Sequence, residues 1–380
     1  MNELNFIKFT FQKDKSMAGI SNNTISMTAM VKTNSLTRIR FKAFIFVFTF
    51  FFLFGCGQRS ARNTGLASKN DKLSKSVTSN KKLREVSFLP YWVTTAQFAG
   101  YYVAEEKGIY EKYGIKINII PFKPFLTSTD LIAEGKTDFA ALWLVNAIEL
   151  KASGVDIVNI EQVSSRSSFM LITKKKSGID SVQKMKGKRV GIWSGFELQP
   201  MALFKKFNVD VITIPIGSTN NLFLMDGVDI TVANWFDEYH SIINSGFDPD
   251  ELNTFFFADN DLNFLEDGIY CLSEKATKEP ELCADFIKAT LEGWRYAFGH
   301  REEAIDIVLR RAKKENLPVN RVHQEWMLDR FKDLYLPEGK TEFNNSLPKN
   351  DYYFVGNVLK GNKLISEVPA YDKFYQPIIK

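Results

Sequence analysis

Aromatic side chains occupy the positions of this sequence at which chemistry could take place. Four of the six tryptophans follow or end short apolar runs that are typical of buried strands, and these are Trp92, Trp143, Trp193 and Trp235. The other two, Trp294 and Trp326, lie in helical patterns and are expected in the core. Rings gathered at strand ends would bind a planar ring or a cation, through stacking or cation–π contact. The pattern therefore predicts a ligand-binding site.

Hydrogen-bonding and further aromatic groups accompany these rings. The full set of predicted ligand-binding residues is Trp92, Gln97, Phe98, Tyr101, Trp143, Asn146, Trp193, Ser194, Trp235, Glu238 and Tyr239. A desolvated carboxylate at Glu238 would select strongly for an amine or a ring N–H. Because acidic residues are also common at helix N-termini, a solvated helix cap is the alternative for Glu238. Ser194 could present backbone N–H groups to an anion, but the following Phe196 and Glu197 argue against an anionic ligand.

The spacings that catalytic and metal sites need are missing from the sequence. His240, His300 and His323 are isolated, without an HExxH or CxxC pattern, and no P-loop is present. Cys271 and Cys283 could pair in an oxidising compartment, or they could stay as two buried thiols. We therefore expect no enzymatic activity, no cofactor and no metal.

Alternating strand and helix patterns must position the predicted site. Val86 to Leu89 predicts a strand, 99–107 a helix and 115–120 a second strand, which is a β-α-β unit of a parallel sheet. Further strands are predicted at 138–143, 155–163, 169–173, 190–193, 211–214, 229–235 and 268–272. Long helices are predicted at 280–298, 302–314 and 321–334, whereas 255–267 has the composition of a loop and 344–380 has no clear pattern. In such sheets ligands bind beside the carboxyl ends of the strands.

Two halves of the chain repeat a short pattern. Gly135-x-x-Asp138, a strand and Trp143 recur as Gly227-x-Asp229, a strand and Trp235. This suggests two similar α/β lobes. The length of 380 residues also exceeds that of one ordinary core.

The first 84 residues differ in composition from the rest. Residues 43–54, eleven of which are apolar, follow several basic residues, and this run is too short to span a membrane but suits a secretion signal. Leu53-Phe54-Gly55-Cys56 resembles a bacterial lipobox, with an uncleaved anchor as the alternative. We expect a leader and signal peptide at 1–55, then a lipid on Cys56 and a polar tether at 56–84. The body would then be anchored to the cell membrane on its extracytoplasmic or periplasmic face.

The charge of the body gives no reason to expect a nucleic-acid partner. The chain has 49 basic and 44 acidic residues, of which seven and two lie in residues 1–55. The remainder therefore holds 42 of each sign, and a neutral body lacks the electrostatic signature of a nucleic-acid binder.

Residues 97–115 resemble a known family. The segments Gln97-Phe98-Ala99-Gly100-Tyr101-Tyr102-Val103-Ala104, Lys107-Gly108-Ile109-Tyr110 and Gly114-Ile115 are similar to the opening motif of the solute-binding proteins that are grouped with the fungal enzyme making the thiamine pyrimidine precursor. Segments at 187–191, 279–282 and 293–304 extend the resemblance over about 86–335. Phe236-Asp237-Glu238-Tyr239 is similar to an aromatic-Asn-Glu-Tyr segment of pyrimidine binders, with Asp237 in place of Asn.

The resemblance implies a two-lobed α/β fold of the periplasmic-binding-protein type (type II), a clamshell in which each lobe is a mostly parallel sheet flanked by helices. Lobe 1 would comprise 85–169 and 270–380, and lobe 2 would comprise 170–269. It implies a monomer that delivers a small-molecule ligand, an aminopyrimidine thiamine precursor first, to an ABC permease and its ATPase by lobe closure. Riboflavin-like, nucleobase or sulfonate ligands, and a tethered sensor of a membrane signalling partner, are the alternatives. The fungal enzyme's cysteine-rich iron site has no counterpart in this sequence.

Overall fold

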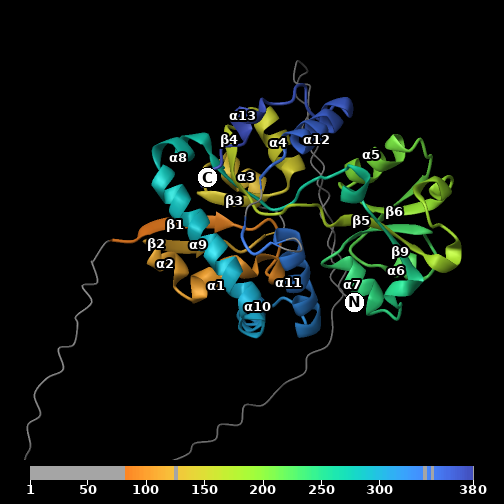
Figure 1. The fold of residues 1–380 in the computed structure, drawn as a ribbon, viewed down its shortest axis with the longest axis horizontal. Helices are drawn as coiled ribbons and strands as arrows, with labels where there is room; N and C mark the ends of the chain where they lie inside the picture. Colours follow the sequence, from red (N-terminus) through yellow and green to blue (C-terminus); the bar gives the residue numbers. More distant parts are fainter. Residues whose placement is uncertain (1–81, 124–126, 337–339, 344–345, 380) are drawn as a thin grey trace, which may run out of the picture. The chain divides into compact units, whose positions relative to one another are not determined.

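The fold is built on two five-stranded sheets (Figure 1). The computed structural model describes residues 82–123, 127–336, 340–343 and 346–379. The first sheet has the order β2-β1-β3-β10-β4 and the second the order β7-β6-β8-β5-β9. The strands are β1 (Arg84–Leu89), β2 (Ile115–Ile119), β3 (Phe139–Leu142), β4 (Ile157–Gln162), β5 (Phe169–Lys174), β6 (Arg189–Trp193), β7 (Ile212–Ile216), β8 (Ile230–Asn234), β9 (Leu252–Phe256) and β10 (Gly268–Leu272). We call each sheet with its helices a lobe, the first and the second. The predicted signal peptide, Cys56 and the tether lie outside the described residues.

Both sheets follow one plan, with a single antiparallel strand between parallel ones. In the first sheet β10 runs antiparallel to β3 and β4, and in the second β5 runs antiparallel to β8 and β9. The remaining pairs are parallel. This confirms the prediction of a two-lobed α/β fold with mostly parallel sheets. The strand predicted at 268–272 does return to the first sheet, whereas β9 was not predicted and overlaps a stretch expected to be a loop.

The repeated pattern of the sequence has a structural counterpart in the two lobes. Asp138 stands before β3 and accepts a hydrogen bond from the backbone N–H of Ser87 in the neighbouring β1, at 2.7 Å. Asp229 stands before β8 and accepts one from the backbone N–H of Arg189 in the neighbouring β6, at 2.9 Å. In each lobe an aspartate thus joins the start of one parallel strand to the next.

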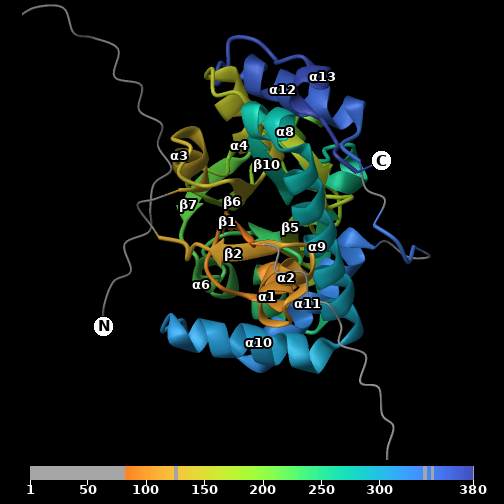
Figure 2. The same cartoon turned by 90° about the vertical axis from the view of Figure 1, so that its left-hand side faces the viewer.

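Helices cover both faces of each sheet. One face of the first sheet is covered by helices that share one hydrophobic cluster. These helices are α1 (Ala99–Glu106), α2 (Ile109–Lys112), α8 (Ser273–Lys278), α9 (Pro280–Gly299), α10 (Arg301–Lys314) and α11 (Arg321–Tyr335). The opposite face carries α3 (Ser128–Ala133), α4 (Leu144–Ala152), α12 (Lys349–Gly361) and α13 (Tyr371–Phe374). Figure 2 shows α1, α2, α9 and α10 grouped beside β1 and β2, with α12 and α13 well apart from them. On the second sheet α5 (Leu198–Lys206) packs on one face, and α6 (Asn221–Leu224) and α7 (Glu238–Ile243) pack on the other.

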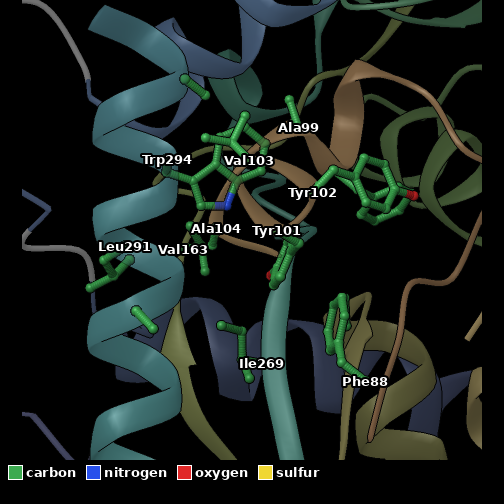
Figure 3. Close-up of a cluster of buried hydrophobic side chains, with 14 of the residues drawn as sticks. Phe88, Ala99, Tyr101, Tyr102, Val103, Ala104, Val163, Ile269, Leu291 and Trp294 are labelled. Atoms are coloured by element: carbon green, nitrogen blue, oxygen red, sulfur yellow. The ribbon is translucent and has the colours of Figure 1, made fainter. Parts of the chain in front are cut away.

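The core of the first lobe forms where α1 lies against α9 (Figure 3). Trp294 is fully buried, as predicted, and its ring meets Tyr101 edge-on at a centroid distance of 6.0 Å. Tyr101 in turn stacks on Phe88 of β1 at 4.2 Å. Tyr101 was predicted to bind ligand, but the structure places its ring in this core, because it faces the sheet from the buried side of α1.

The two segments that connect the lobes are bonded to each other. Glu266 lies in the second connection, and its carboxylate accepts hydrogen bonds from the hydroxyl of Ser167 (2.7 Å) and the backbone N–H of Ser168 (3.1 Å) in the first. The side-chain amide of Gln162 donates to the carbonyl of Glu266 at 2.8 Å. The domain boundaries expected near 169 and 270 stay predictions. None of the helices in the described part of the chain is both long and apolar enough to cross a membrane.

Candidate ligand-binding site

Aromatic rings from both lobes meet where the connecting segments enter the sheets. Trp143 follows β3 of the first lobe, Phe169 opens β5 and Trp193 ends β6 of the second lobe. The Trp143 and Phe169 ring centroids are 6.4 Å apart, and Phe169 stacks on Trp193 at 5.4 Å. These rings meet because each lies at an end of its sheet that faces the connecting segments.

Tyr91 and Phe196 complete this group, which we call the interlobe aromatic cluster (Tyr91, Trp143, Phe169, Trp193 and Phe196). Tyr91 meets Trp143 edge-on at 6.1 Å, and Phe196 meets Trp143 at 5.4 Å and Trp193 at 5.8 Å. Trp143 and Trp193 keep part of their surface exposed. The indole N–H of Trp143 is buried and makes no well-formed hydrogen bond among the described residues, although the Tyr91 hydroxyl is its polar neighbour. A buried donor of this kind favours a partner that can accept a hydrogen bond.

A buried carboxyl group lies at the polar edge of this cluster. The Tyr91 hydroxyl donates to Oδ1 of Asp267 at 2.6 Å, and the Gln97 side-chain amide donates to the Tyr91 hydroxyl oxygen. Burial raises the pKa of Asp267 to about 7, although hydrogen bonding from Tyr91 acts in the opposite direction. Burial also raises the pKa of the adjacent Glu266 to about 8. Neither acid was predicted from the sequence, where the only available signal was an acidic pair directly before a strand.

Trp235 directly follows β8 and belongs to a second group of rings, which lies beside α11. The Arg330 guanidinium lies 4.8 Å from the Trp235 ring centroid and 4.5 Å from that of Trp326. The Trp326 indole N–H donates to the carbonyl of Trp235 at 3.0 Å. Trp326 was expected in the core, but it is only partly buried and contacts the second lobe. One face of Trp235 is thus in contact with a protein cation.

Glu238 and Tyr239 also lie near α11. Glu238 is the first residue of α7, and its Oε2 accepts a hydrogen bond from the backbone N–H of Asn234 at 2.9 Å. Burial, reinforced by the charge of Asp237, raises the pKa of Glu238 to about 8. The Tyr239 ring lies 6.0 Å from the Trp326 ring. One oxygen of the Glu238 carboxylate, which was predicted to bind ligand, therefore bonds the turn between β8 and α7.

The remaining predicted site residues are dispersed. Trp92 is 40% exposed and packs on Phe122 at 5.4 Å, while its neighbour Tyr91 enters the aromatic cluster. Asn146 and Ser194 are exposed. Phe98 is buried and meets Tyr91 edge-on at 5.3 Å. The predicted residues that come together around the interlobe aromatic cluster are Gln97, Phe98, Trp143 and Trp193, and those that come together near α11 are Trp235, Glu238 and Tyr239.

Two further interpretations of the sequence concern histidine and cysteine. His240 and His323 are isolated in the sequence but meet in the structure, where Nδ1 of His240 lies 2.8 Å from Nδ1 of His323. Cys271 and Cys283 are buried free thiols in the core of the first lobe. In the described part of the chain no three His, Cys, Asp or Glu residues are grouped so that they could hold a metal ion.

The architecture is that of the two-lobed periplasmic binding proteins. The fold matches a structure described as a putative sulfonate ABC transporter, periplasmic sulfonate-binding protein SsuA, from Methylobacillus flagellatus, with a TM-score of 0.60, 17% identity and coverage of 78% of this chain and 92% of that one. It also matches the periplasmic aliphatic sulphonate binding protein SsuA from Escherichia coli, with a TM-score of 0.59, 15% identity and coverage of 77% and 92%. At these identities the likeness concerns the fold.

The chain belongs to the NMT1/THI5-like family, whose model matches residues 95–304, more than half of its length. A 4-amino-5-hydroxymethyl-2-methylpyrimidine phosphate synthase of Legionella pneumophila is 27% identical over 59% of this chain and 72% of its own. The riboflavin-binding protein RibY of Chloroflexus aurantiacus is 24% identical over 60% and 66%. For a synthase of Schizosaccharomyces pombe, 30% identical, the match spans 33% of this chain and only 36% of the relative.

Proposed function

We propose that this chain is an extracytoplasmic solute-binding protein that delivers a small planar heterocycle to an ABC importer. An aminopyrimidine thiamine precursor is the first candidate ligand, and a riboflavin-type solute is the second. The binding-protein fold and the names of the relatives support this class of function. A ligand held by both lobes favours the closed arrangement, because only that arrangement offers contacts from both. The permease and its ATPase are then the expected partners.

The interlobe aromatic cluster is the observation that carries the proposal. Trp143 and Trp193 come from different lobes, are partly exposed and are linked through Phe169 and Phe196. A flat ring inserted between them would stack on one and accept a hydrogen bond from the indole N–H of Trp143. Ring nitrogens and carbonyl oxygens of pyrimidines and flavins are such acceptors.

The polar edge of the cluster suits the same class of ligand. A carboxyl group whose pKa is raised to about 7 can either donate or accept a hydrogen bond near neutral pH, and Asp267 is such a group. An aminopyrimidine offers both a donor and an acceptor. A sulfonate would need cations or several free donors, whereas the ionisable side chains at this edge, Asp267 and Glu266, are both acidic.

Catalysis is a second candidate, because several relatives are named as synthases. We favour binding because the fungal enzyme relies on a cysteine-rich iron site, whereas Cys271 and Cys283 are fully buried in the first-lobe core. A sensor that passes ligand binding to a membrane signalling partner would use the same lobes. The anchor proposed at Cys56 fits both an importer and a sensor.

A thermal-shift screen of the full chain against an aminopyrimidine, a flavin, a nucleobase and an alkanesulfonate tests this function. A ligand at a hundredfold excess over its Kd stabilises the folded state by about 2.7 kcal/mol. We expect the aminopyrimidine to raise Tm and the sulfonate to leave it unchanged. A shift with sulfonate alone would overturn the proposed ligand class, and no shift with any of the four would contradict the proposed function.

Variants then test the site. Trp193→Ala removes a stacking surface worth about 1–3 kcal/mol, so Kd should rise about 5- to 150-fold. Trp143→Phe keeps a ring but removes the N–H, and should weaken ligands that carry an acceptor. Trp92→Ala provides the comparison, because the exposed Trp92 packs on Phe122 instead. If Trp92→Ala abolishes binding while the other two variants bind normally, the site lies elsewhere.

A further inference from the structure

Two histidines from different lobes are in direct contact. His240 lies on α7 of the second lobe and His323 on α11, and their Nδ1 atoms are 2.8 Å apart. Nε2 of His323 lies 2.9 Å from Oδ1 of Asp237, which directly precedes α7. The three side chains form a continuous chain of hydrogen bonds, Asp237–His323–His240.

Helix α11 belongs to the first lobe, so this chain of hydrogen bonds joins the lobes. The side-chain oxygen of Gln324 accepts a hydrogen bond from the backbone N–H of Ala96 at 2.6 Å, and Met327 and Leu328 are buried in the first-lobe core. Next to the histidines, the Trp326 ring stacks on His240 at 4.8 Å. This stacking and the hydrogen bond from Trp326 to Trp235 are further contacts of α11 with the second lobe.

The geometry limits how many protons the pair can hold. A hydrogen bond between two Nδ1 atoms needs one hydrogen, so one of these nitrogens must keep its lone pair. One added proton fits, because a doubly protonated His323 can donate from Nε2 to Asp237 and from Nδ1 to His240. A second added proton would place two N–H groups and two positive charges head to head, which breaks the contact.

Nearby charges reinforce this limit. Burial lowers the pKa of His240, and the adjacent His323 and Arg330 of α11 lower it further, whereas Asp237 raises it. Arg330 is itself paired with Asp333, and Glu238 accepts from its own strand. A lowered pKa means that the contact is more stable with a neutral His240 than with a protonated one. The contact is therefore favoured above the ordinary histidine pKa of about 6.5 and is weakened as the pH falls below it. Acidification should therefore part the lobes at this point.

We propose that Asp237, His323 and His240 form a proton-sensitive latch between the lobes, engaged at neutral pH and released in mild acid. The ligand-binding consequence rests on the proposed function: release of the latch weakens the hold on a ligand between the lobes. The latch itself is a property of the two lobes and needs no ligand.

Nuclear magnetic resonance of the histidine ring carbons in the full chain tests the latch without a ligand. The chain has only three histidines, and the exposed His300 provides an internal reference. We expect the His240 and His323 signals to change together between pH 7.5 and 5, and the radius of gyration from X-ray scattering to increase over the same range. His323→Gln should change the His240 titration and remove the pH dependence of the radius. His300→Gln should leave both unchanged.

The proposal would be overturned if His240 and His323 titrate independently, each unaffected by replacement of the other. It would also be overturned if the radius of gyration changes equally with pH in the wild type and in His323→Gln. His240→Gln provides a second variant if His323→Gln fails to fold. For a ligand that binds, the Kd of the wild type should be higher in acid than at neutral pH. The rise should be about tenfold if the contact lowers the His240 pKa by one, and the latch variants should show no such rise. Coupled titrations without any solute binding would reject the proposed function and keep the latch.

Discussion

The close contact between α1 and α9 makes a sharp prediction about Gly293. A Cβ atom added there would lie 2.7 Å from Cβ and 3.2 Å from the backbone nitrogen of Ala104, and closer still to the carbonyl oxygen of Gly100. Side-chain rotation cannot relieve these contacts, because they involve the backbone and a Cβ atom of α1. Gly293→Ala must therefore push the helices apart, and it disturbs the packing around Trp294.

The expected cost follows from this geometry. Overpacking a well-packed core costs about 1–3 kcal/mol, and contacts with backbone atoms place Gly293→Ala at the upper end. An unfolding entropy of about 2.1 cal/mol/K per residue over the roughly 290 described residues corresponds to about 1.6 °C of Tm per kcal/mol, so Tm should fall by about 5 °C. Because α1 begins directly after Gln97 and Phe98, which both contact Tyr91, the variant should also weaken ligand binding.

Urea unfolding of two variants of the same helix checks this reasoning. Gly299 is the last residue of α9, and an added Cβ there meets nothing within 4 Å. Gly299→Ala should leave the free energy of unfolding unchanged or raise it by up to about 1 kcal/mol, because alanine loses less conformational entropy than glycine. Equal stability of Gly293→Ala and Gly299→Ala would refute the argument from close approach.

Two further predictions concern buried carboxyl groups and pH. Burial raises the pKa of Glu161 on β4 to about 8, so its contribution to stability is complete below its ordinary pKa of 4.5 and is lost as the pH rises through 8. Glu161→Gln should therefore abolish part of the fall in Tm between pH 6 and 9, and parallel profiles for wild type and variant would contradict this. Burial acts to raise the pKa of Asp138, but hydrogen bonds from Ser87 and the Lys275 ammonium outweigh burial and lower the pKa. The contribution of the Asp138 carboxylate to stability is therefore present above its ordinary pKa and is lost as the pH falls. Asp138→Asn should cost about 1–3 kcal/mol at pH 7 and less at pH 3, and an equal loss at both pH values would argue against the carboxylate's role.

Local periodicity was enough to predict most elements of the fold. Apolar runs and glycine-marked turns predicted nine of the ten strands approximately, and the aspartate before β3 and β8 signalled two similar lobes. The predicted long helices agree with α9, α10 and α11 to within about two residues. Among the missed elements, β9 and α12 lie in stretches where aromatic and polar residues mix without a clear period, and α2, α8 and α13 are too short to show one. Secondary structure is predictable here because burial of one face leaves its mark within a few neighbouring residues.

The composition of the candidate site depended on tertiary structure. Tyr91 and Trp92 are adjacent residues after Pro90, where strand alternation has ended, so the sequence could not determine which ring would turn toward Trp143. Asp267 meets Tyr91 across 176 positions of the chain, and His323 meets His240 across 83. Tryptophans at strand ends were visible in the sequence, because strand ends are local features. Their division into one group around Trp143 and another around Arg330 was decided by how the chain crosses between the sheets, since only that crossing brings distant side chains into contact.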